Sequence, residues 1–522
     1  MKKILYLFLI IFLSAGYTAC SEDALEVAPT DRVAGPTIFK DINSATVAMD
    51  GVYRALFISG WTDGNTHQNF GILSTKMYTS LMGEDFLQDQ MGNGWFYFDY
   101  RYDVRSRYTS TNWRSYASWN FYYTLISNVN YIIAQKDNIT GDPKLVNNLI
   151  AQALTMRAYS YFQLIQTFQQ TYKGNESKPG VPLYTEPTTA QSKGKGRGTV
   201  EEVYTQINTD LDDAIKLFEG DKTIQTHKSH IDYYIANAIK ANVSLVQNKW
   251  ADAAKYADEA LKKPGLNMIS TQADLTSGFN NRNMTSVMWG SEIIADQSTI
   301  YASFFSHMDA SATGMYGAAS RKCIYNWLYD QIPETDLRKK WWNGKLPDAQ
   351  IKSSGPSQSY AQFKFRFSDP TKYLGDYIYM RAEEMQLVKA EALCHNEQYP
   401  EAKAALEALM KLRNPTGYAN QLASLTMSKD LSFVSYGSVT TLMDMILLQR
   451  RIELWGEAER IFDILRLKTG FDRTAPNSNH SQKLLPTINT LEPASKHFIL
   501  TIPQKEFDGN PSLDATKDQN PL

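Results

Sequence analysis

The sequence predicts a mostly α-helical protein: a frame of tetratricopeptide-like helical hairpins that carries a large irregular insertion of loops and short strands. Three observations support this prediction. Helical periodicity dominates several long stretches, two distant segments resemble each other as helix–turn–helix units, and residues 265–375 are rich in Gly, Ser, Asn and aromatic side chains. Apolar side chains that recur every three to four residues indicate amphipathic helices.

The composition is ordinary for a folded globular protein and excludes several classes. The 522 residues are 43% hydrophobic, too apolar for a disordered chain. A net charge of -2 does not fit a nucleic-acid binder, and a mean hydropathy of -0.39 does not fit a polytopic membrane protein. Three cysteines cannot build a disulfide framework. Aromatic residues, in contrast, reach 12%, with 31 Tyr and 10 Trp.

The first residues have the pattern of an export signal. Two lysines precede an apolar run at residues 4–13, which as a helix would rise only ~15 Å, about half of a bilayer core. Residues 1–19 are therefore interpreted as a signal peptide. Small residues directly before Cys20 resemble a lipobox, although Tyr17 stands where Leu is usual, and predict that Cys20 carries acyl chains. A secreted protein with an unmodified cysteine is the alternative.

Capping and periodicity place the first long helices of the frame. Thr199 followed by Glu202 fits a capping box and predicts a helix that begins at residue 200. Residues 149–168 predict another helix, and residues 174–198, rich in Pro, Gly, Lys and Thr, predict the loop between them.

Two segments, 241–261 and 390–411, align when Trp250 is matched with Tyr399. Small residues then coincide, including Ala253 with Ala402, where two helices of a hairpin would cross closely. The aligned positions lie 149 residues apart, so the units are not in tandem and the stack must accommodate the insertion. Within the insertion, residues 286–294 and 363–367 predict short strands, and a second aromatic-rich stretch, 61–119, predicts further loops and small strands.

Four features, taken in order, identify a family resemblance. They are the lipoprotein-like start followed by residues 25–29, the segment 379–392, the segment 450–466, and the Pro- and Asn-containing end at 502–521. Together they resemble the SusD/RagB family of outer-membrane glycan-binding lipoproteins. The chain ends at Leu522 where that family often continues with Gly-Tyr, which puts only the terminal contact in question.

The resemblance implies a SusD-like fold and a domain organisation. Residues 20–522 would form one domain with a helical frame at about 40–60, 120–264 and 376–522, and ligand-facing loops at about 61–119 and 265–375. It also implies a surface-exposed lipoprotein, anchored in the outer membrane by lipid alone, that binds oligosaccharide or polysaccharide. A SusC-like TonB-dependent transporter would be its partner, with no catalysis, cofactor or nucleic acid involved.

Enzyme and metal patterns are weak in this chain. Glu453 and Glu457 lie one helical turn apart and could act as an acid–base pair, but an amphipathic helix with salt bridges explains them better. His227 and His230 lack an evident third ligand, so no metal site is predicted. Phosphate-loop, zinc-protease and serine-hydrolase motifs are absent from the sequence.

Aromatic side chains beside polar groups are the predicted sugar-binding residues. An aromatic ring packs on the apolar face of a sugar, while amide, carboxylate and guanidinium groups pair with its hydroxyls. Trp95 leads because the turn-forming residues 92–94 precede it. The full candidate set is Trp61, Asp85, Asn93, Trp95, Tyr97, Arg105, Tyr301 and Tyr316. Packing in the core is the competing explanation for each aromatic ring.

The predicted function is glycan capture at the cell surface and delivery to the transporter. Two alternatives remain at this point. A surface glycoside hydrolase is one, because glycosidases share no single motif. A surface lipoprotein that handles peptide or other non-sugar cargo is the other.

Overall fold

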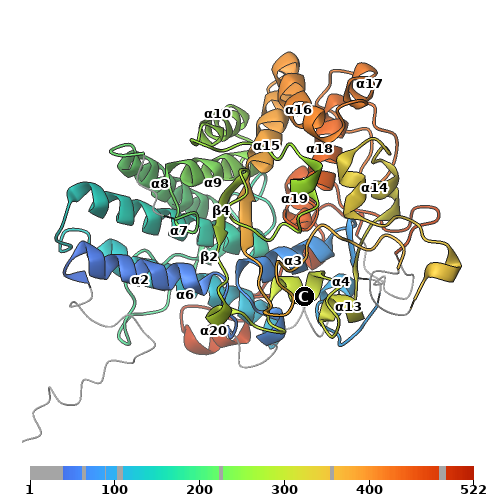
Figure 1. Ribbon diagram of the computed structural model, residues 1–522. Coiled ribbons are helices and arrows are strands. Elements are labelled where there is room, and N and C mark those ends of the chain that lie inside the picture. The colour runs from blue at the N-terminus through green and yellow to red at the C-terminus, as the bar shows by residue number, and fades with distance from the viewer. Residues whose placement is uncertain are drawn as a thin grey trace, which may run out of the picture.

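A computed structural model of the protein describes residues 39–61, 66–88, 90–102, 110–222, 227–352, 358–480 and 490–521 (Figure 1). The predicted signal peptide and Cys20 lie outside these residues. Within the described ranges, no helix has the length and apolar character needed to cross a bilayer.

The frame is a continuous stack of antiparallel helices. Its members are α6 (Trp113–Ala134), α7 (Pro143–Phe168), α8 (Val200–Phe218), α9 (Tyr233–Val246), α10 (Trp250–Leu261), α15 (Ala382–His395), α16 (Tyr399–Arg413) and α18 (Leu442–Glu453). Each packs on the next in this order up to α16, and α18 packs on α15 and α16 (Figure 1). The capping box at the start of α8 is confirmed, with Thr199 and Glu202 each accepting a hydrogen bond from the other's backbone amide. The prediction of a mostly helical protein is confirmed.

The two predicted hairpins are α9–α10 and α15–α16, and they lie directly against each other. Ala253 and Ala402 are both fully buried, as close helix crossings require. The indole of Trp250 stacks on the imidazole of His395 with 3.9 Å between ring centroids, which joins α10 to α15. The two hairpins are therefore distant in sequence but neighbours in space. The insertion departs from the helical stack after α10, and the chain returns to the stack at α15.

In the described part of the chain, three small antiparallel sheets of two strands each accompany the helices. They pair β1 (Phe86–Gln88) with β5 (Lys322–Ile324), β2 (Pro179–Pro182) with β3 (Arg197–Thr199), and β4 (Val287–Ser291) with β6 (Tyr377–Arg381). The strand predicted at 286–294 is thus confirmed as β4. The strand predicted at 363–367 is wrong: this segment is irregular because Lys364 turns inward and its ammonium binds the carboxylate of Glu457.

The other helices pack around and within this arrangement. They are α2 (Ile42–Ala55), α3 (Ile72–Met82), α4 (Tyr97–Arg101), α11 (Gln272–Leu275), α12 (Phe304–Met308), α13 (Tyr316–Ala319), α14 (Asn326–Asp330), α17 (Tyr418–Ala423), α19 (Arg460–Leu467) and α20 (Gln504–Gly509). The remaining 3-10 turns are η4 (Thr66–Gln68), η5 (Ala295–Gln297), η6 (Leu337–Trp341), η7 (Asp348–Gln350) and η8 (Lys496–Phe498).

Helix α3 corrects the expectation that residues 61–119 form only loops and small strands. All eleven of its residues are buried, including Lys76, whose ammonium donates to the carbonyls of Tyr379 and Glu457. A helix that is buried all round has no polar face, so its sequence lacks the periodic pattern of an amphipathic helix.

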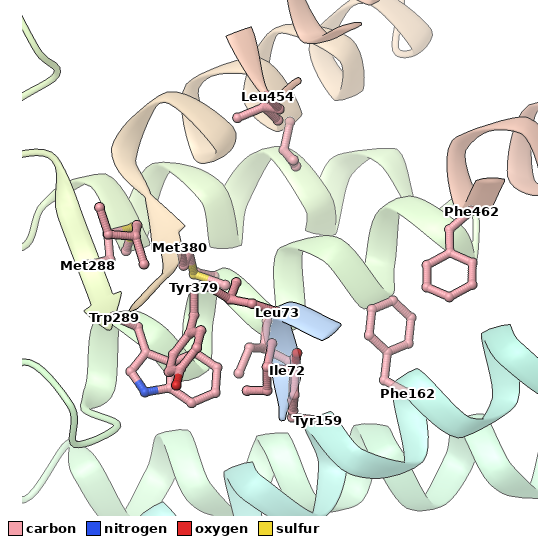
Figure 2. Packing of buried hydrophobic residues seen from close by; sticks show 14 of the residues in the cluster. Ile72, Leu73, Tyr159, Phe162, Met288, Trp289, Tyr379, Met380, Leu454 and Phe462 are labelled. Atoms are coloured by element: carbon pink, nitrogen blue, oxygen red, sulfur yellow. The ribbon is translucent and has the colours of Figure 1, made fainter. Parts of the chain in front are cut away.

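Figure 2 shows where the sheet β4–β6 meets the helices. Trp289 of β4 packs edge-on against Tyr379 of β6 and against Tyr159 of α7, with centroid distances of 5.0 and 5.4 Å. Ile72 and Leu73 of α3 lie beside these rings (Figure 2). The insertion is therefore fixed to the frame by a shared core, which gives its loops a rigid base.

The segment 450–466 does not form the single amphipathic helix that we expected. Helix α18 ends at Glu453, and α19 begins only at Arg460. Glu457 forms ion pairs with Arg381 and Lys364, and Arg460 forms one with Glu84. These partners come from other elements because both groups are buried and face the interior.

Candidate functional site

Aromatic side chains from three distant segments meet near α4 and α13, and we call this cluster the aromatic platform. Figure 1 shows the two helices side by side. It consists of Trp95, Tyr301, Tyr316 and His67. Tyr316 lies 5.2 Å from Tyr301 and 5.9 Å from Trp95 between ring centroids. His67 lies 5.3 Å from Trp95 and 5.5 Å from Tyr301, so it fills the space between them.

A tight turn presents Trp95 to the platform. Gly92 and Gly94 both have positive φ values, 52° and 85°, a conformation that favours glycine. A Cβ on Gly92 would lie 2.8 Å from the Cβ of Ser320, so the turn packs too closely there for a side chain. Ser320 also donates its hydroxyl proton to the carbonyl of Gln90, at 2.6 Å. The turn is thus held against the residue that follows α13.

Buried groups hold the other rings. The hydroxyl of Tyr316 and Nδ1 of His67 share a hydrogen bond of 2.6 Å. Beneath them, His307 of α12 stacks on Tyr316 at 4.9 Å and donates from Nε2 to the carbonyl of His67, at 2.7 Å. Burial lowers the pKa of His307 well below its usual value, so the ring stays neutral at physiological pH. Burial also raises the pKa of Tyr316, which keeps its hydroxyl protonated.

The platform offers an aromatic surface with few polar groups. Exposure increases from Tyr316, at 8%, to Tyr301, at 37%, and Trp95 is half-buried between these limits. A surface of this kind suits the apolar face of a planar or ring-shaped ligand, with hydrogen bonds supplied from its edge. The four platform residues include no serine, cysteine or carboxylate.

Among the other candidates, Asn93 is exposed in the turn before Trp95. Tyr97 is buried in the first turn of α4, under the guanidinium of Arg101. Asp85 is buried, and both of its carboxylate oxygens accept hydrogen bonds from Arg451, at 2.6–3.1 Å. We therefore leave Asp85 and Tyr97 out of the proposed contact surface, because their functional groups are committed inside the protein.

Trp61 packs edge-on against Phe121 of α6, at 4.9 Å, and its indole N–H donates to the carbonyl of Ile58. Arg105 lies outside the described residues.

The sequence alone did not single out His67 or His307 as site residues. Neither histidine belongs to a motif, and only the location of His67 within the aromatic-rich stretch 61–119 could have drawn attention to it.

The two histidines considered as metal ligands lie elsewhere, each beside a carboxylate. His230 binds Asp50 at 3.0 Å, and His227 lies 3.7 Å from Glu292. Across the part of the chain that the structure describes, no group of three or more His, Cys, Asp or Glu side chains is arranged to hold a metal ion.

Two models of known protein families match this chain. A family model described as "Starch-binding associating with outer membrane" matches residues 71–245, and the SusD family model matches residues 280–522. Together the two models cover most of the chain. The protein belongs to the SusD/RagB family. This family is non-catalytic, which agrees with the prediction that the protein is not an enzyme.

Individual relatives match over almost their whole length. SusD-like protein P2 of Formosa agariphila is 24% identical over 98% of this chain and 99% of its own. A SusD-like carbohydrate-binding protein from Bacteroides vulgatus superposes with a TM-score of 0.74 at 23% identity, covering 93% of this chain and 99% of that one. Surface glycan-binding protein A from Bacteroides uniformis gives a TM-score of 0.65 at 18% identity, covering 92% and 99%. The predicted SusD-like fold is confirmed.

Proposed function

We propose that the protein is a cell-surface lipoprotein that binds oligosaccharide on the aromatic platform and passes it to a TonB-dependent transporter in the outer membrane. The observation that carries this proposal is the convergence of Trp95, Tyr301 and Tyr316 into one partly exposed patch. Tyr301 is 37% exposed beside these two rings, so the patch is open to solvent. Family membership supports a glycan as the ligand, as does the similarity to carbohydrate-binding and surface glycan-binding proteins.

The anchor and the partner complete the proposal. Lipidation at Cys20 would hold the protein at the membrane, and stable anchoring requires more than one acyl chain because a single chain binds with a constant of only ~10⁴ M⁻¹. Tethering the binder beside the channel makes transfer of the sugar intramolecular, which raises its effective concentration at the transporter. The segment Ser21-Glu22-Asp23 resembles the acidic signal that sends some lipoproteins to the outer surface.

The test is a glycan array followed by calorimetric titration with the glycan that it identifies. Trp95→Ala is expected to raise Kd at least about fivefold, or ~1 kcal/mol, because it removes one ring of the platform. Trp95→Phe keeps an aromatic ring and is expected to retain most of the affinity. Tyr418→Ala, which removes a half-buried ring of α17 that lies outside the platform, is the control and is expected to bind like the wild type.

Thermal melts accompany every titration, because Trp95 is half-buried and packs against the core. Equal affinity in Trp95→Ala and wild type would remove the platform from the binding site. A peptide array run in parallel decides between glycan and peptide cargo: binding to peptides alone would contradict the proposal. Co-purification of a TonB-dependent transporter with the lipidated protein from outer membranes tests the partner.

A further inference from the structure

A groove lies between helix α6, the loop that joins β2 to β3, and α20. Its volume is about 430 Å³, within the range of roughly 300–1,000 Å³ that is typical of small-molecule sites. None of the platform residues lines it. In Figure 1, α20 and α6 lie along the same lower edge of the molecule as α4 and α13.

Aromatic rings form one wall of this groove. Tyr123 packs against Trp119 at 4.8 Å and against Tyr184 at 6.0 Å between centroids, and Tyr116 continues the row on α6. Trp119 is buried, but Tyr116, Tyr123 and Tyr184 are each partly exposed toward the groove. The hydroxyl of Tyr184 accepts a hydrogen bond from the backbone amide of Lys195, so the loop fixes the position of this ring.

Polar and charged groups form the rim. Lys193 and Lys505 are both exposed and line the groove, and the ammonium of Lys505 lies 4.1 Å from the centroid of the Tyr116 ring. The carboxylate of Glu506 is held by internal hydrogen bonds from the indole N–H of Trp119, at 3.0 Å, and the amide of Asn510, at 2.8 Å. Among the described residues that line the groove, the charged groups are therefore the ammonium groups of Lys193 and Lys505 and the carboxylate of Glu506, whose oxygens accept internal hydrogen bonds.

We infer that this groove is a second carbohydrate-binding site, which takes an oligosaccharide that bears carboxylate or sulfate groups. The rings of Tyr116 and Tyr184 supply faces for the apolar side of sugar units. Lys193 and Lys505 supply the charge that pairs with the acidic substituents, and Asn120 supplies an amide for hydroxyl groups. The site is separate from the platform and does not require the platform to bind.

Three probes distinguish the ligand classes. An oligogalacturonate of eight units carries carboxylates, a carrageenan oligosaccharide of similar length carries sulfates, and maltoheptaose is neutral. Calorimetric titrations use wild type, Tyr184→Ala, the double variant Lys193→Gln/Lys505→Gln, and Trp95→Ala. Tyr418→Ala is the matched control, because a lysine lies over both rings: Lys195 is 5.7 Å from the centroid of Tyr184, and Lys411 is 5.5 Å from that of Tyr418, which is outside the groove.

At least one acidic probe is expected to bind, with Kd raised at least about fivefold in Tyr184→Ala and in the lysine variant, and unchanged in Trp95→Ala and Tyr418→Ala. Binding of that probe is also expected to weaken as salt rises from 50 to 300 mM. If Tyr184→Ala melts at a lower temperature than the wild type, its weaker binding no longer reports on ligand contact alone. The lysine variant changes only exposed side chains, so its affinity then decides whether the groove binds the probe.

Three results would overturn the inference: no acidic probe binds, the groove variants bind like the wild type, or maltoheptaose shows the same dependence on the groove lysines. Loss of acidic-probe binding in Trp95→Ala alone would assign that ligand to the platform and would likewise reject the second site. Failure of the platform proposal leaves this test unaffected, because each site has its own variants.

Discussion

Replacing Glu453 by Gln should destabilise the protein strongly. Glu453 is fully buried, and its carboxylate accepts hydrogen bonds from Arg413 at 2.8 and 3.0 Å, from Arg338 at 3.2 Å and from Arg381 at 3.3 Å. These groups belong to a buried network with four acidic and four basic members: Asp336, Glu383, Glu453 and Glu457 with Arg338, Lys364, Arg381 and Arg413. The wild-type network is therefore balanced in charge.

The substitution leaves the shape of the side chain almost unchanged but gives the network one uncompensated positive charge. Removing one partner of a buried ion pair typically costs about 3–5 kcal/mol. We expect a loss of this size in the free energy of unfolding, measured by urea titration at pH 7. Glu407→Gln is the control, since Glu407 pairs with Lys411 on the half-exposed surface of α16, where such pairs contribute less than about 1 kcal/mol.

The pH dependence gives an independent check. Burial by itself would raise the pKa of Glu453, but attraction to Arg413, Arg381 and Arg338 overrides it and holds the pKa well below its usual value. A carboxyl group whose pKa is depressed by folding stabilises the native state above its unfolded pKa of about 4.3, and this contribution is lost as pH falls toward the folded value. The wild type should therefore lose more stability between pH 5 and pH 3 than Glu453→Gln. A loss below about 1 kcal/mol at pH 7, together with an unchanged pH slope, would refute this account of the network.

Two further predictions concern the frame and the anchor. Ala402→Trp should lower the free energy of unfolding by about 1–3 kcal/mol, because Ala402 is fully buried at the crossing of α15 and α16. The control is Glu401→Trp at the exposed neighbouring position, which should have little effect. Equal melting temperatures for the two variants would show that the crossing is loose. Cys20→Ala should move the protein out of the membrane fraction and abolish labelling with palmitate, and a variant that remains labelled would contradict lipidation at Cys20.

The local features of the fold could be predicted because they depend on neighbouring residues. The capping box of α8 is a contact between residues three apart, and the small residues of the hairpins, such as Ala253, repeat at helical spacing. Helix α3 and the irregular segment 363–367 could not be predicted in this way. Their conformations depend on burial against distant partners, such as the pairing of Lys364 with Glu457, which lies 93 positions further along the chain.

The candidate site shows the same division. The turn before Trp95 could be predicted because two glycines and an asparagine favour it locally. The meeting of His67 with Tyr316, 249 residues away, is a property of the folded chain alone. No pattern in the sequence could select His67, because its role comes from its contacts with the rings of Trp95 and Tyr301.

The structure also shows that core packing and ligand contact are not exclusive alternatives for an aromatic side chain here. Tyr316 is 92% covered and rests on His307, yet its ring also continues the surface formed by Tyr301, which is 37% exposed. Tyr301→Ala should therefore weaken glycan binding and leave the melting temperature nearly unchanged. Tyr316→Ala should weaken glycan binding and also lower the melting temperature. Tyr316→Phe separates the two roles, since it keeps the ring but removes the hydroxyl that bonds to His67. Calorimetric titration measures the glycan affinity of the three variants, and thermal melts measure their stability. A large loss of stability in Tyr301→Ala, or normal binding in a folded Tyr316→Ala, would contradict a platform whose inner ring is part of the core and whose outer ring faces the ligand.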